Sequence, residues 1–98
     1  MKSIIYGCFV TNKITSGNYR YYLYSRIDNY ALIMREKITD DEWLVRIIRP
    51  EENIVTVWAA ATSQTYVRPD ALSTSDKRIV VNKMRQFLGA NKNFINNF

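Results

Sequence analysis

Histidine is absent from this 98-residue sequence, and cysteine occurs only once, as Cys8. The lack of histidine excludes a Ser-His-Asp or Cys-His catalytic site, a histidine metal ligand and a histidine pH switch. A single cysteine excludes an internal disulfide and any zinc site built on two or four cysteines. We therefore expect a protein that is not an enzyme and that holds no metal and no cofactor.

Glycine and proline are also scarce, with 3 and 2 residues, and long apolar runs are missing. The apolar run over residues 4–10 is too short for a signal peptide, and no stretch approaches the ~20 apolar residues of a membrane span. The hydrophobic fraction of 47% is ordinary for a globular domain. These features predict a cytoplasmic protein with a single domain, residues 1–98, that ends in a short Asn-rich tail over residues 90–98.

Aromatic and β-branched residues indicate a hairpin near the middle of the chain. Residues 19–27 and 30–38 are rich in both types and flank Asp28-Asn29, which predicts two antiparallel strands joined by a two-residue turn. Residues 3–14 are expected to form an earlier strand, which the sequence Thr15-Ser16-Gly17-Asn18 turns into the hairpin.

Two later segments complete the expected sheet. Residues 43–49 alternate apolar and basic side chains and are interpreted as a strand, with a short helix opened by the capping pattern at residues 39–42 as the alternative. Residues 54–61 contain a nearly continuous run of valine and alanine, which favours a strand in the middle of the sheet. All strands would then lie within residues 3–61.

The last third of the chain changes period. Ser73, Thr74 and Ser75 offer N-caps for a helix over about residues 75–88. Apolar residues then recur at helical spacing, at Ile79, Val80, Met84, Phe87 and Leu88. The helix is expected to end at Gly89 or to continue towards the C-terminus, where the same spacing persists. The fold class is therefore α+β, an antiparallel meander sheet of four or five strands with a C-terminal helix packed on one face.

The two-residue turn also predicts which side chains share a face of the hairpin. It pairs Tyr22 with Arg35 and Arg20 with Lys37, on an outward face that carries cations, tyrosines and no acid. Nucleic-acid binders use such platforms, because bases stack on the rings for roughly 1–3 kcal/mol each and cations hold phosphates. The alternative is an ordinary solvated strand face, and a register shift of one residue would exchange the two faces. The candidate residues of this platform are Arg20, Tyr22, Tyr24, Arg26, Arg35 and Lys37.

The net charge of +5 belongs to the C-terminal segment, since residues 77–98 contain basic residues and no acidic one. On a helix, Arg78, Arg85 and Lys92 follow one another at just under two turns and line up as a stripe. This stripe would contact phosphates or an acidic protein face. The alternative is an amphipathic helix whose cations interact favourably with its C-terminal dipole.

Both basic features favour a non-catalytic binding module that docks on a polyanionic surface, nucleic acid or a protein–nucleic-acid complex, with no membrane partner. The alternative is a protein-binding inhibitor or adaptor of the phage or mobile-element type, which would act by blocking a host protein surface. Tyrosine, tryptophan and arginine are also typical of protein interfaces. The sequence does not indicate an oligomeric state.

Overall fold

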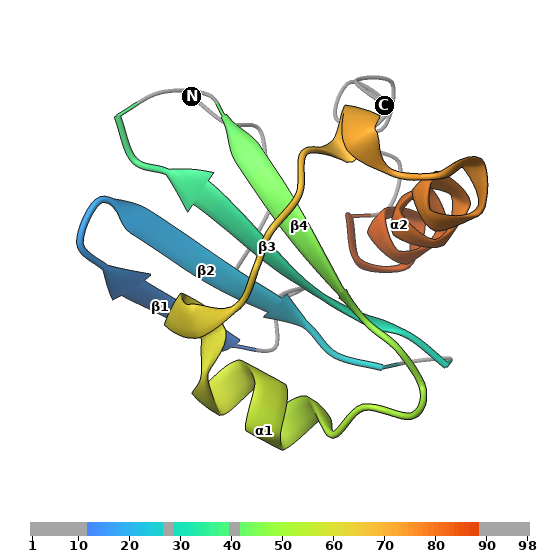
Figure 1. Cartoon of the computed structure of the whole chain (residues 1–98), viewed down its shortest axis with the longest axis horizontal. Coiled ribbons are helices and arrows are strands. Elements are labelled where there is room, and N and C mark those ends of the chain that lie inside the picture. The colour runs from blue at the N-terminus through green and yellow to red at the C-terminus, as the bar shows by residue number, and fades with distance from the viewer. Residues whose placement is uncertain (1–11, 27–28, 40–41, 89–98) are drawn as a thin grey trace.

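The computed structural model describes residues 12–26, 29–39 and 42–88, the last three of them by their backbone alone. Four strands come first, β1 (Asn12–Ser16), β2 (Tyr19–Tyr24), β3 (Ala31–Lys37) and β4 (Trp43–Ile48). They are followed by α1 (Ile54–Ala59), the short 3₁₀ helices η1 (Ala61–Ser63) and η2 (Pro69–Ala71), and α2 (Thr74–Leu88). The strands pair in the antiparallel order β1-β2-β3-β4, so the predicted α+β meander is confirmed (Figure 1).

The first hairpin depends on a glycine. β1 and β2 are joined at Gly17-Asn18, and Gly17 has a φ of 60°, a left-handed conformation that glycine adopts without a steric penalty. The strand predicted over residues 3–14 is confirmed for residues 12–14, which lie in β1, and β1 continues for two residues beyond the predicted end. Residues 3–11 of the prediction lie outside the described residues. The strand predicted over residues 43–49 is confirmed as β4.

The predicted register of the second hairpin is wrong by one residue. Tyr22 pairs with Met34, and Arg20 pairs with Glu36, instead of with Arg35 and Lys37. β2 already ends at Tyr24, so the connection to β3 is longer than the two-residue turn that we expected. Because side chains alternate between the two faces of a strand, a shift of one residue between the strands regroups every side chain of the predicted platform.

The strand predicted over residues 54–61 is also wrong, because this segment forms α1 and enters η1. The Asn53 side chain caps α1 by accepting a hydrogen bond from the Thr56 N–H at 2.9 Å. Val57 is buried, and Ile54 and Trp58 pack beside it against the sheet, so the apolar residues follow a helical spacing. The β-branched composition of the segment did not decide its structure.

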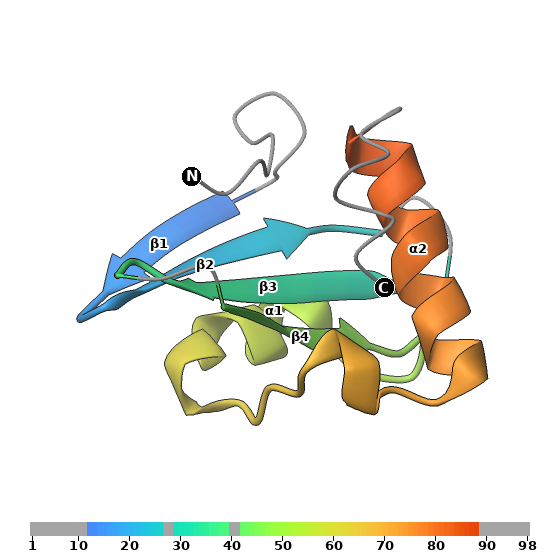
Figure 2. The same cartoon turned by 90° about the horizontal axis from the view of Figure 1, so that it is seen from above.

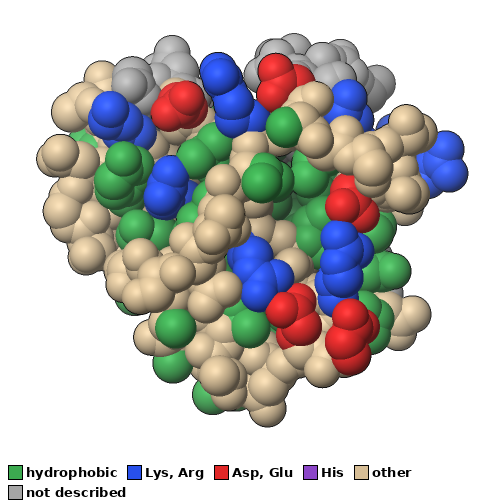
Figure 3. Space-filling model, in the orientation of Figure 1, with side chains coloured by type: hydrophobic (Ala, Val, Ile, Leu, Met, Phe, Trp, Pro, Cys, Tyr) green, Lys and Arg blue, Asp and Glu red, His purple; other side chains and the backbone are tan. Residues whose placement is uncertain are grey.

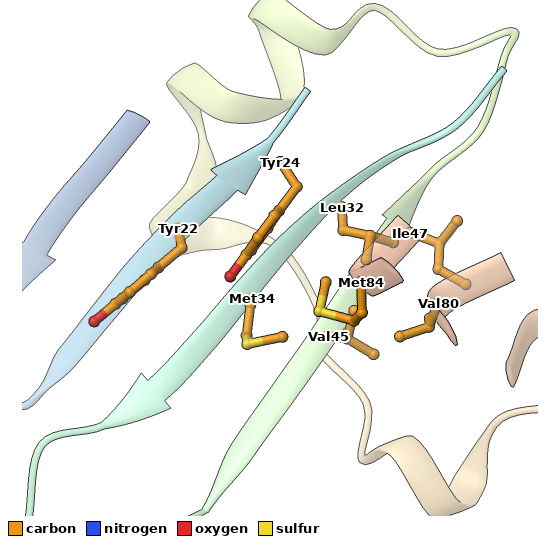
Figure 4. Packing of buried hydrophobic residues seen from close by; sticks show 8 residues of the cluster. All are labelled: Tyr22, Tyr24, Leu32, Met34, Val45, Ile47, Val80 and Met84. Carbon is orange, nitrogen blue, oxygen red and sulfur yellow. The ribbon is translucent and has the colours of Figure 1, made fainter. Parts of the chain in front are cut away.

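Helices cover both faces of the sheet. Figure 2 shows α1 against one face, while α2 crosses the end of the sheet at which β2 ends and β3 begins. On the face towards α1, the buried cluster consists of Tyr21, Leu23, Ala31, Ile33, Ile48, Val57 and Ala61. On the face towards α2, it consists of Tyr22, Tyr24, Leu32, Met34, Val45, Ile47, Val80 and Met84 (Figure 4).

The second cluster corrects the expected exposure of two tyrosines. Tyr22 and Tyr24 are completely buried, and Figure 4 shows their rings extending from β2 over the face that also carries Met34. They form part of the core and cannot stack on a base from solvent. The exposed tyrosine platform of the sequence prediction is therefore not formed.

The C-terminal helix begins within a residue of its predicted start. Ser73 caps it, since its hydroxyl accepts a hydrogen bond from the Asp76 N–H at 3.1 Å. Val80 and Met84 are buried against the sheet, and Ile79 packs beside them, which confirms the predicted packing on one face. Residues 89–98, with Lys92 and the Asn-rich tail, lie outside the described residues, and so do the side chains of Phe87 and Leu88. Within the described part of the chain, no helix has the length and apolar character needed to cross a membrane.

Candidate binding surface

The six residues of the predicted platform lie in three different places. Arg20, Tyr22 and Tyr24 belong to the face that packs against α2, whereas Arg35 and Lys37 lie on the opposite face of the sheet. Arg26 lies beyond the end of β2, in the connection to β3. The structure therefore does not bring these residues together as one site.

Arg20 and Tyr22 instead surround a buried acid. The Tyr22 hydroxyl donates to Glu36 Oε1 at 2.6 Å, and Arg20 Nη1 lies 3.3 Å from the same oxygen. The Glu36 side chain is only 1% exposed, so these contacts stabilise a carboxylate that water does not reach. Burial, together with Tyr22 and Glu36 nearby, raises the pKa of Tyr24 above its ordinary value. This cluster belongs to the core.

Arg26 holds two loops together. Its Nη2 donates to the backbone carbonyl of Arg49 and, at 3.0 Å, to that of Glu52, while its Nε lies 3.4 Å from the carbonyl of Asn29. The guanidinium thus ties the β2–β3 connection to the segment between β4 and α1. These contacts use donors that a phosphate would otherwise take.

Three further arginines, none of them a predicted site residue, form ion pairs. Arg46 donates to both carboxylate oxygens of Glu52, at 3.0 and 2.8 Å, and Arg49 Nη2 lies 2.9 Å from Asp76 Oδ2. The Arg46 bonds, with a further bond from the Arg49 N–H, lower the pKa of Glu52 to about 2. Arg68 lies 4.0 Å from Glu42 in a looser, exposed pair. The charge of these arginines is locally neutralised.

Arg35 differs from these arginines because aromatic rings surround it. Its guanidinium carbon lies 4.4 Å from the centroid of the Tyr19 ring and 5.0 Å from that of the Tyr66 ring. Lys37 is the register partner of Tyr19 on the same face of the sheet. The Tyr66 ring also lies 5.8 Å from the Tyr21 ring, in a tilted arrangement. Tyr19 and Tyr66 were not among the predicted site residues. The β-branched and aromatic residues Thr65, Tyr66 and Val67 were the available signal for a short extended segment.

The remaining predicted residues lie on α2. Arg78 and Arg85 are exposed, and Lys77 is half-buried beside them. No ion pair or hydrogen bond holds these three side chains within the part of the chain that the structure describes. We refer to Lys77, Arg78 and Arg85 as the α2 basic face. Lys92, the third residue of the predicted stripe, lies outside the described residues.

A groove of about 330 Å³ lies between β4, the segment 65–73 and the start of α2. Val45, Ile47 and Leu72 line it, and the Arg49–Asp76 ion pair lies at its edge. Figure 3 shows the face with α1 and the segment that leads to α2, on which basic and acidic side chains are interspersed. The groove therefore lies in a region of balanced charge, unlike the α2 basic face.

The described residues contain no group of three or more acidic or cysteine side chains that could hold a metal ion. The chain matches no protein-family model, and neither the curated proteins nor the solved structures provide a match. Unpaired cations on one helix offer long-range attraction and contacts to phosphate or carboxylate oxygens.

Proposed function

We propose that the protein is a non-catalytic binding module that docks on a polyanionic surface, nucleic acid in the first place, through the α2 basic face. The observation that carries this proposal is the distribution of ion pairs. Arg20, Arg46, Arg49 and Arg68 each lie within 4.0 Å of an acidic oxygen, whereas Arg78 and Arg85 are exposed and have no acidic partner among the described residues. Positive charge that the protein does not neutralise itself is available to a partner.

The proposed contact is with the nucleic-acid backbone. The buried Tyr22 and Tyr24 offer no ring to a base, so these two tyrosines do not contribute stacking. Binding through Arg78 and Arg85 releases counterions from phosphates, which makes it salt-dependent and largely independent of sequence. The alternative function, a protein-binding inhibitor or adaptor, would depend on aromatic anchors and respond to salt mainly through its association rate.

Fluorescence anisotropy with a labelled oligonucleotide, measured over a series of salt concentrations, tests the proposal. The double variant Arg78→Gln, Arg85→Gln should weaken binding and reduce the log–log salt slope by up to ~0.7–0.9 per lost phosphate contact. The loss should be similar for different oligonucleotide sequences, because phosphate contacts carry no sequence information.

The matched control is the double variant Lys13→Gln, Arg68→Gln. It removes the same formal charge from two exposed positions outside α2. If both double variants lose affinity equally, net charge and not the α2 basic face is responsible. If the unmodified protein does not bind at low salt, the proposed function is refuted.

A further inference from the structure

The strongest feature outside α2 is the Arg35 guanidinium on the opposite face of the sheet, held between Tyr19 and Tyr66. We propose that this arginine is a second binding site, which takes a carboxylate group presented by a protein or peptide partner. The site is independent of polyanion binding by α2, and it would make the module an adaptor with two different partners.

The rings position the guanidinium before any ligand arrives. Tyr66 is fixed because its hydroxyl donates to the Ala61 carbonyl at 2.7 Å, and its ring packs against that of the buried Tyr21. The Tyr19 ring approaches Arg35 more closely still, at 4.4 Å. A stacked guanidinium loses little conformational freedom on binding, which reduces the entropic cost of holding a ligand.

Arg35 makes no hydrogen bond to a described residue beside these two ring contacts. A guanidinium has five N–H donors in its own plane, and a ring that lies against its face does not accept from them. Within the residues that the structure describes, Arg35 has no ion pair, whereas Arg46 on the same face of the sheet is bound by Glu52. Arg35 is half-buried, and a planar carboxylate can accept two parallel hydrogen bonds from the edge of a guanidinium.

The surroundings of Arg35 favour a protein partner over nucleic acid. One row of side chains across this face of the sheet consists of Ile14, Tyr21, Arg35 and Leu44. Ile14 is 38% exposed, and Leu44 is half-buried. An arginine among aromatic and aliphatic side chains is typical of the centre of a protein interface. The face in Figure 3, on the same side of the sheet as α1, carries acids among its cations, so it lacks the continuous positive charge that attracts a polyanion.

The test uses random peptides displayed on phage, selected on the full-length protein and compared with the variant Arg35→Lys. This variant keeps the positive charge but lacks the planar group that stacks and binds in a bidentate manner. We expect enriched peptides that share an aspartate or glutamate. They should bind Arg35→Lys about tenfold more weakly, and changing their acid to the amide should cause a similar loss.

The oligonucleotide assay on the same Arg35→Lys protein separates this inference from the proposed function. We expect unchanged anisotropy titrations, because the α2 basic face is intact. If Arg35→Lys weakens oligonucleotide binding as much as the α2 double variant does, nucleic acid reaches this face and the inference is overturned. It is also overturned if the selection yields no peptide that distinguishes Arg35 from lysine. An amide-proton NMR spectrum that matches the unmodified protein confirms that Arg35→Lys is folded.

Discussion

The substitution Tyr22→Phe removes a single oxygen from the core and leaves the ring in place. That oxygen donates the 2.6 Å hydrogen bond to Glu36, whose carboxylate is buried beneath the face that packs against α2. Arg20 would still contact Glu36 Oε1, at 3.3 Å, from a side chain that is 37% exposed. The second carboxylate oxygen, Oε2, has no hydrogen-bond partner among the described residues and cannot compensate.

The expected cost follows from the chemistry of this bond. A hydrogen bond to a charged group contributes about 1.5–3 kcal/mol to the free energy of unfolding. The buried Glu36 oxygen cannot accept a replacement hydrogen bond from water when the Tyr22 hydroxyl is removed. A domain of this size has about 5–15 kcal/mol of stability in total. With a shift of about 4–8 °C per kcal/mol, Tyr22→Phe should lower Tm by roughly 6–24 °C.

Thermal melts and urea titrations followed by tryptophan fluorescence measure this loss. The matched control is Tyr19→Phe, which removes the same atom from a half-buried tyrosine whose described contacts are made by its ring. The control should change the free energy of unfolding by less than about 0.5 kcal/mol. Equal losses in the two variants, or no loss for Tyr22→Phe, would refute the role assigned to the Tyr22–Glu36 bond.

Three further predictions concern local structure. Arg46 lowers the pKa of Glu52 from 4.5 to about 2, so the stability from this pair should be present above pH 4.5 and lost as the pH falls towards 2. When urea midpoints are measured between pH 2 and 4.5, the variant Glu52→Gln should show a flatter pH profile than the unmodified protein. Asn53→Ala removes the N-cap of α1 and should cost about 1 kcal/mol by urea titration, with Asn53→Ser close to neutral. Gly17→Ala should lower the free energy of unfolding by about 1 kcal/mol in thermal melts, because alanine disfavours the left-handed backbone of this position. A clash does not contribute, since an added Cβ meets no atom within 4 Å, and Gly17→Asn should cost less because asparagine tolerates this conformation better.

The register of the second hairpin shows why the platform could not be predicted. Residues 21–24 and 31–34 are buried at every position, so neither strand has the alternation that identifies an inward face. One electrostatic signal was present in the sequence. The predicted register placed Arg20 opposite Lys37, whereas a shift of one residue places it opposite Glu36, with the opposite charge. The charges of opposed residues therefore indicated the register of this hairpin better than the residue types of the expected turn did.

The segment after β4 was misinterpreted for a related reason. The run of valine and alanine favoured a strand, but Ile54, Val57, Trp58 and Ala61 also follow the spacing of a helix face. Asn53 immediately precedes this pattern as a helix cap. Recognising this helix would also have predicted that the sheet is covered on both sides, which explains the continuous burial of β2 and β3.

The hairpin platform and the α2 basic face differ in how their cations are paired. Arg20 of the platform is paired with an acid from another element of the fold, whereas Arg78 and Arg85 of α2 have no such partner among the described residues. Arg20 meets Glu36 only after β2 and β3 pair, and Arg49 meets Asp76 only after α2 docks, so a count of charges along the chain cannot show that these cations are engaged. On α2, the sequence contains no acid after Asp76. Among the described residues, no acid pairs with the exposed Arg78 and Arg85, and this available charge is the property that the proposed function requires.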